Sequence, residues 1–209
     1  MVRRITKELK EHIPFTALGA LTGIIIIAIV VLCNVPHHIS DTIFHTLHPV
    51  HVLLSALVTT AMYMKYKKGK VWAVILIGWT GSIGIATISD ALIPHLGGTL
   101  LHVQMERHIP FIEHWWINLF ALAGIGIGYW KQTTRIPHFG HVLLSTWASL
   151  FYIMAFGIAT DWIPLLPFIF LILFLAVWIP CCLSDIVYPL LFLGKEPELP
   201  LPERRKIAS

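Results

Sequence analysis

Six stretches of this chain carry almost no charge and are candidates to cross a lipid bilayer as helices, of which the second and fourth are short unless they borrow flanking residues. They lie at approximately 13–35, 49–65, 71–92, 114–131, 140–160 and 163–184. Because hydrocarbon offers the backbone no hydrogen-bonding partner, a stretch of about 20 apolar residues satisfies its own polar groups only as a helix. The pattern predicts an all-α, polytopic membrane protein with six transmembrane helices.

Composition agrees with a chain that lies in a bilayer. Hydrophobic residues make up 56% and charged residues 12% of the sequence, whereas a soluble domain has roughly 25% charged residues. The net charge of +4 could suggest a nucleic-acid partner, but the basic residues form short clusters beside the apolar stretches. Orientation in the membrane accounts for such clusters, so we expect no nucleic acid and take the lipid bilayer as a partner.

The basic clusters also predict the direction of the chain. They lie at 3–10, 65–70, 131–135 and 204–206. With six spans, all four clusters fall on one side of the membrane, which the positive-inside rule makes the cytoplasm. No small-residue cleavage site follows the first apolar stretch, so we expect it to be retained. The prediction is a multi-pass protein of the plasma (inner) membrane with both termini cytoplasmic.

A motif near the middle of the chain recurs in its second half. His-Pro-Val-His-Val-Leu-Leu-Ser at 48–55 returns as His-Phe-Gly-His-Val-Leu-Leu-Ser at 138–145, and two further pairs, around 12 and 108 and around Asp90 and Asp185, match in the same order. These landmarks predict a single membrane domain, 1–209, built from repeats at 12–98 and 108–194 with a cytoplasmic tail at 195–209. Since each repeat holds three spans, the second enters the membrane from the opposite side, as in inverted-repeat transporters.

Twelve histidines accompany only eleven acidic residues, and many lie in the two segments expected to face outward. Neutral imidazole binds zinc, copper, iron and nickel, and carboxylates complete such sites. Residues three or four apart share one face of a helix, which lets His48 and His51 point together. The predicted metal ligands, with zinc favoured, are Asp41, His45, His48, His51, Asp90, His95, His138, His141 and Asp185.

The repeat arranges these ligands as two His-x-x-His plus Asp constellations, one near each membrane face. The outer one contains His48, His51 and Asp90, and the inner one contains His138, His141 and Asp185. Pro49 predicts a break, so residues 41–51 are not expected to form one straight helix. The alternative is that these histidines cap helices and the aspartates bond to nearby backbone.

Three further groups of residues in the sequence have candidate roles. The second outward segment also contains His102, Glu106, His108, Glu113 and His114, of which Glu113 and His114 either join the outer cluster or lie at the membrane interface. Cys181 and Cys182 fit buried apolar positions better than a soft-metal site. Gly124 and Gly128 have the spacing of a helix-packing motif.

Two functions follow from a histidine-rich membrane bundle. The first is transport of divalent transition metal ions, which the repeated constellation favours. The second is a membrane-embedded zinc-dependent hydrolase acting on a lipid or lipid-linked substrate at the outer face, where zinc lowers the pKa of bound water and Asp41 or Asp90 serves as base. Bis-histidine haem is disfavoured because the inverted topology separates His51 from His141. The sequence leaves open whether the protein is an enzyme, and it permits a homo-oligomer or a structural role in a complex.

Overall fold

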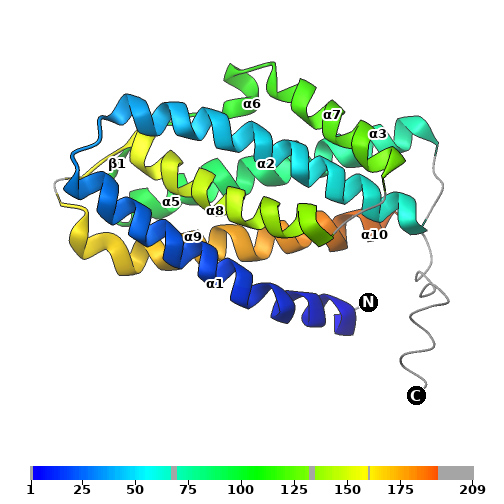
Figure 1. The fold of residues 1–209 in the computed structure, drawn as a ribbon, viewed down its shortest axis with the longest axis horizontal. Coiled ribbons are helices and arrows are strands. Elements are labelled where there is room, and N and C mark those ends of the chain that lie inside the picture. Colours follow the sequence, from blue (N-terminus) through cyan, green and yellow to red (C-terminus); the bar gives the residue numbers. More distant parts are fainter. Residues whose placement is uncertain (1, 67–69, 132–134, 160, 193–209) are drawn as a thin grey trace.

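The structure is a computed structural model that describes residues 2–66, 70–131, 135–159 and 161–192. Within these ranges, the side chains at 2–9, 11–12, 66, 135–139, 182, 185–186 and 190 are not described. The described chain is almost entirely helical, which confirms the all-α prediction. Its helical segments run back and forth along the long axis of the molecule (Figure 1).

The first half of the chain forms three long helical segments. They are α1 (Val2–Leu32), α2 (His37–Tyr66) and a rod that runs from Val71 to Leu100. The rod consists of α3 (Val71–Trp79), η1 (Thr80–Gly84), α4 (Ile85–Thr87), η2 (Ile88–Leu92) and α5 (Ile93–Leu100). Both η1 and η2 are π-helical turns, a local widening that often marks functional sites, and η2 contains Asp90.

The second half begins with short elements and continues as three further helical segments. It contains β1 (Gln104–Met105), α6 (Pro110–Glu113), α7 (Ile117–Trp130), α8 (Arg135–Phe156), β2 (Gly157–Ile158), η3 (Ile163–Leu165), α9 (Leu166–Cys182), η4 (Leu183–Val187) and α10 (Tyr188–Leu191). Strands β1 and β2 pair antiparallel, with Gln104 opposite Ile158. This short ladder ties the segment after α5 to the end of α8.

Helix α2 lies at the centre of the bundle and packs against both α7 and α8, while α1 packs against α8 and α9 (Figure 1). The close approach of α7 depends on two glycines. A Cβ atom at Gly124 or at Gly128 would collide with the carbonyl oxygen of Leu53 or Leu57 of α2. Small residues at this spacing allow two backbones to come together, so the predicted packing role of this motif is confirmed.

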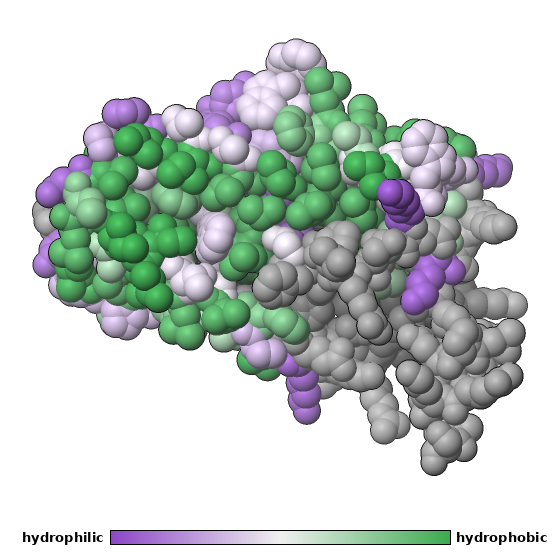
Figure 2. All heavy atoms as spheres, in the orientation of Figure 1, coloured by the Kyte–Doolittle hydropathy of each residue, from purple (hydrophilic) through white to green (hydrophobic). Residues whose placement is uncertain are grey.

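Four helices are long and apolar enough to cross a membrane: Ile13–Leu32, His37–Lys65, Val71–Leu100 and Ile163–Cys181. The other two expected spans correspond to shorter apolar helices, Ile117–Trp130 and Gly140–Phe156. Apolar residues cover much of the face of the bundle that is drawn in colour in Figure 2. On α1, for example, Leu21, Ile25 and Ile29 are all more than half exposed. Such a stripe is suited to contact with lipid.

Pro14 and Pro49 both lie inside helices. Pro49 was expected to break the segment 41–51, but α2 continues through it without interruption. A proline removes one backbone hydrogen bond, whereas ending a helix in an apolar environment leaves several polar groups unsatisfied. Continuing the helix is therefore the smaller loss. As a result Asp41, His45, His48 and His51 are carried by one helix.

Candidate metal centre

The inward face of α2 carries a line of polar side chains along much of its length. His45, His48, His51, Ser55 and Thr59 recur at intervals of three or four residues, which places them on one side of the helix. His48, His51 and Ser55 are each 1% exposed, and Thr59 is fully buried. Buried polar groups in an apolar bundle require partners, and the partners come from the rod, α8 and η4.

Asp90 is the centre of this buried network. Its side chain has no exposure to solvent. One carboxylate oxygen, Oδ2, accepts hydrogen bonds from His48 Nδ1 at 2.8 Å and from His51 Nδ1 at 2.6 Å. The other oxygen, Oδ1, accepts from Ser89 at 2.7 Å and from Ser145 at 2.8 Å. The outer constellation predicted from the sequence is thus brought together in the interior of the bundle.

The structure corrects the expected separation of His51 from His141. The Nε2 atom of His51 lies 3.1 Å from Nδ1 of His141, and both side chains are buried. The two residues meet because α2 and α8 pack along each other, so that equivalent positions of the repeated motif fall at the same depth. Since the ring centroids are only 5.1 Å apart, haem still has no room between them.

These contacts bring together two sets of metal-ligand atoms. His48, His51 and Asp90 form one set, and His51, His141 and Cys181 form the other; within each set, one ligand atom per residue lies within 4.8 Å of the others. All of these residues are buried. Imidazole, carboxylate and thiolate together suit zinc or another borderline transition metal. Cys181, expected to be an apolar filler, therefore belongs to the candidate centre.

Hydroxyl groups extend the network along the bundle in two matching sets. Ser145 Oγ lies 3.3 Å from Ser89 Oγ, and Ser149 donates to the Ser89 carbonyl at 3.0 Å. On the other side, Ser55 Oγ lies 3.2 Å from Ser184 Oγ, and Thr59 donates to the Ser184 carbonyl at 3.3 Å. One set thus surrounds Ser89 beside Asp90, and the other surrounds Ser184 in η4.

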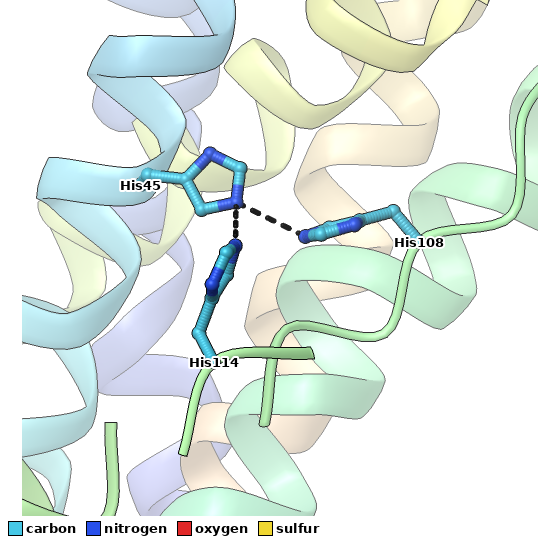
Figure 3. Close-up of side chains that lie close together, drawn as sticks. All are labelled: His45, His108 and His114. Carbon is cyan, nitrogen blue, oxygen red and sulfur yellow. Dashed lines mark hydrogen bonds between the residues drawn. The ribbon is translucent and has the colours of Figure 1, made fainter. Parts of the chain in front are cut away.

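A second cluster lies toward the beginning of α2 (Figure 3). The Nε2 atom of His45 lies 3.1 Å from Nε2 of His108 and 2.9 Å from Nε2 of His114. His108 precedes α6 and His114 follows it, so the two residues flank this short helix. His108 is 8% exposed, and His45 and His114 are partly exposed. This cluster is accessible from outside the bundle, in contrast to the buried centre.

Glu113 contacts the side of the His108 ring that faces away from His45, and the pKa values of both groups are shifted. Glu113 Oε2 lies 2.6 Å from His108 Nδ1. Burial of the His108 ring lowers its pKa, although neighbouring Glu113 favours the charged form. Partial burial by itself would raise the pKa of Glu113, but the hydrogen bond from the Ile109 N–H and the proximity of His108 outweigh it and lower that pKa. Both shifts favour a neutral imidazole beside an ionised carboxylate.

The remaining predicted ligands lie elsewhere or are not described. Asp41 is near His45, with 3.2 Å between Oδ1 and Nδ1. His95 is on α5, outside the three ligand groups formed by the described side chains, and its Nδ1 atom has no hydrogen-bond partner there. The side chains of His138 and Asp185 fall outside the described residues. The inner constellation is therefore represented by His141 alone.

His108 and His114 were missing from the predicted ligand list although the sequence places them in the same outward segment as other candidates. Their signal was the clustering of histidines with acidic neighbours at 106–114. Spacing alone could not show that both approach His45, which is more than 60 residues earlier in the chain.

Comparison of the chain with family models, with curated proteins and with solved structures finds no significant match.

Proposed function

We propose that this protein transports a divalent transition metal ion, with Zn²⁺ favoured, across a membrane, and that the buried centre holds the ion during its passage. The centre comprises His48, His51, Asp90, His141 and Cys181. The observation that carries the proposal is the Asp90 carboxylate, fully buried in an apolar helix and bound by two imidazoles at 2.6 and 2.8 Å. An ionisable group inside a membrane-spanning segment is costly and by default marks an ion or substrate path.

The hydrogen-bond directions suggest how protons accompany the ion. Because a carboxylate oxygen only accepts, His48 and His51 each carry a proton on Nδ1. A metal bound at Nδ1 of His51 requires that proton to leave or to shift to Nε2. With both rings neutral, Nε2 of His51 is then an acceptor, so the proton in its 3.1 Å contact comes from Nδ1 of His141, and a shift on one ring requires a shift on the other. Metal binding would therefore be sensitive to pH.

The matched contacts of the two halves support an inverted repeat. Ser145 with Ser89 corresponds, by the repeat, to Ser55 with Ser184, and the two hydroxyl distances are 3.3 and 3.2 Å. Both Ser-Asp pairs also lie in π-helical turns, η2 and η4. A pseudo-two-fold relation of this kind places transport sites where the halves meet, and His51 and His141 lie there. We take six spans as part of this proposal.

The alternative hydrolase receives less support from the geometry. Zinc hydrolysis requires a carboxylate or another base that can reach the metal-bound water. Asp90, one candidate base, is buried and has hydrogen bonds at both oxygens. Asp41, the other, lies beside Nδ1 of His45, on the side of the ring opposite the converging Nε2 atoms. Both carboxylates therefore already contact other groups.

Uptake into proteoliposomes tests the proposal directly. The purified protein is reconstituted around a zinc-sensitive dye, and Zn²⁺ is added outside. We expect time-dependent uptake by the wild type and a loss of at least tenfold in Asp90→Asn and in His141→Gln. Thr87→Val is the matched control, because Thr87 is a buried hydroxyl on the same rod that donates to the carbonyl of Ile83 within its own helix.

The result that would overturn the proposal is an absence of uptake by correctly folded wild-type protein in both orientations and with a pH gradient of either sign. Equal uptake by the wild type and Asp90→Asn would also overturn it. The same preparation, assayed for zinc-dependent release of a fluorescent alcohol from a lipid-linked ester, tests the hydrolase. Ester release without uptake would favour the alternative.

A further inference from the structure

His45, His108 and His114 come from two separate parts of the chain, and their Nε2 atoms point toward one another (Figure 3). His45 is on α2, whereas the other two flank α6. The ligand atoms of all three residues lie within 4.8 Å of one another. Segments that are distant in the chain therefore place three nitrogen atoms around one point near the end of the bundle.

In two of the three rings, the group that contacts Nδ1 determines which nitrogen carries the proton. His45 Nδ1 lies 2.9 Å from the carbonyl oxygen of Asp41, and a carbonyl can only accept. His108 Nδ1 lies 2.6 Å from a carboxylate oxygen of Glu113, which also accepts. Both rings must donate from Nδ1. In their neutral forms the Nε2 atoms of His45 and His108 are then lone-pair acceptors.

Two acceptors face each other across the 3.1 Å between His45 Nε2 and His108 Nε2. No hydrogen bond can form there between neutral rings, so the contact is unfavourable unless a cation lies between the nitrogens. His114 adds a third nitrogen, 2.9 Å from His45 Nε2. One extra proton would bridge a single pair of nitrogens, whereas a metal ion can accept all three lone pairs.

The spacing also fits a small tetrahedral ion. Zinc binds imidazole nitrogen at about 2.0–2.1 Å, which puts two tetrahedral ligands about 3.3 Å apart. The observed 2.9 and 3.1 Å separations need to widen by only a few tenths of an ångström. A ligating histidine usually donates its other ring N–H to a carbonyl or a carboxylate, which orients the ring and raises the basicity of the ligating nitrogen. Asp41 and Glu113 serve as these positioning residues.

We propose that His45, His108 and His114 bind Zn²⁺ through their Nε2 atoms as a second metal site, separate from the buried centre. Three protein ligands leave the fourth position for water or an exchangeable ligand. The ion ties the segment around α6 to α2. The site does not depend on transport, because its ligands do not include any residue of the buried centre.

Metal content measured after dialysis against Zn²⁺ tests this site. We expect two ions per wild-type chain if the buried centre also binds, and loss of one ion in His108→Gln and in His114→Gln. Asp90→Asn should retain the outer ion. Cobalt provides an independent signal, because tetrahedral Co²⁺ absorbs strongly in the visible range; this absorption should disappear in His108→Gln but remain in Asp90→Asn.

The matched control is His38→Gln, an exposed histidine of the same helix that lies outside the three ligand groups. It should leave both the metal content and the cobalt spectrum unchanged. Glu113→Gln keeps all three ligands and should weaken zinc binding by about 10-fold to 100-fold. If the wild type binds one ion and His108→Gln binds none, the outer site exists and the buried centre fails, so the two proposals are separable.

Hydrogen exchange of the wild-type protein tests the site even when the ligand variants do not fold. In the wild type, addition of Zn²⁺ should slow exchange across 106–116, because the ion joins this segment to α2. Unchanged exchange in this segment, or equal zinc content in the wild type and a folded His108→Gln variant, would overturn the proposal.

Discussion

The Nδ1 atom of His51 lies 2.6 Å from Oδ2 of Asp90, although the two residues are 39 positions apart and neither side chain reaches solvent. The contact joins α2 to a π-helical turn of the rod, where the widened helix presents Asp90 toward the centre of the bundle. His48 reaches the same oxygen from one turn earlier on α2. A buried charge is tolerated only with such partners, so the folding of the bundle and the chemistry of the site depend on the same few bonds.

Removal of the Ser145 hydroxyl should destabilise the bundle more than removal of the Ser55 hydroxyl. Ser145 donates to the Asp90 carboxylate at 2.8 Å, while Ser55 lies 3.2 Å from the neutral hydroxyl of Ser184. A hydrogen bond to a charged group contributes about 1.5–3 kcal/mol, and a neutral bond in a membrane protein contributes about 0.6 kcal/mol. Reversible unfolding of Ser145→Ala and Ser55→Ala in mixed micelles measures the difference.

Because the two serines occupy equivalent places in the repeated motif, each variant is the control for the other. Equal losses of unfolding free energy would contradict the assignment of Asp90 as the charged member of the network.

Gly124 and Gly126 should respond in opposite directions to the same substitution. A Cβ atom at Gly124 would collide with the backbone of α2, whereas nothing lies within 4 Å of a Cβ atom at Gly126. Gly124→Ala should cost about 1–3 kcal/mol through overpacking. Gly126→Ala should be neutral or should stabilise α7 by up to about 1 kcal/mol, because alanine favours the helix.

Thermal unfolding of the two alanine variants in one detergent provides the measurement. A Gly124→Ala variant as stable as Gly126→Ala would show that α7 does not pack closely against α2.

Acidification should lower the stability of the metal-free protein through the groups of the outer segment. The pKa of His108 is lowered from about 6.5 in the folded protein, so the unfolded chain takes up a proton first and stability falls as the pH drops below that value. The pKa of Glu113 is also lowered, from about 4.5, and the stability that it contributes above that value is lost as the pH falls through its folded pKa. Both effects act in the same direction.

Thermal unfolding of the zinc-free protein from about pH 8 down to about pH 4 should reveal this decline. His108→Gln should flatten the upper part of the curve, and Glu113→Gln should flatten the lower part. An unchanged curve in both variants would assign the pH dependence to other groups.

Tyr152→Phe should loosen the outer cluster without removing any of the three imidazoles. The Tyr152 hydroxyl donates to the His108 carbonyl at 3.1 Å and accepts from the His108 N–H at 3.3 Å. Its loss leaves two buried backbone groups without this partner, at a cost of about 1–3 kcal/mol. We expect faster hydrogen exchange at 106–110 and weaker zinc binding at the outer site, with the buried centre unaffected.

Tyr63→Phe is the control, because Tyr63 is also a buried tyrosine but packs in the cluster around Ile125. Equal effects of the two substitutions on zinc affinity would mean that Tyr152 does not position His108.

The sequence predicted the helical architecture with membrane-spanning helices and the shared helix face of the residues around His48 because those signals are local. Long apolar windows require helices, and the spacing of His48, His51 and Ser55 places them on one helix face. The packing role of Gly124 and Gly128 was readable for the same reason. Asp90 stood out since an acidic residue at the edge of an apolar span needs a partner.

What only the tertiary structure decided was which distant groups meet. His51 contacts His141 because two long helices lie along each other at one particular register, and a shift of a single turn would move one ring about 5.4 Å along the helix axis relative to the other. His45 meets His108 and His114 because the segment around α6 is held by the β1–β2 ladder and Tyr152. Pro49 stays within α2 because an apolar surrounding penalises a broken helix more than one missing hydrogen bond. Periodicity assigns a side chain to a helix face, but only the packing of the helices determines what that face contacts.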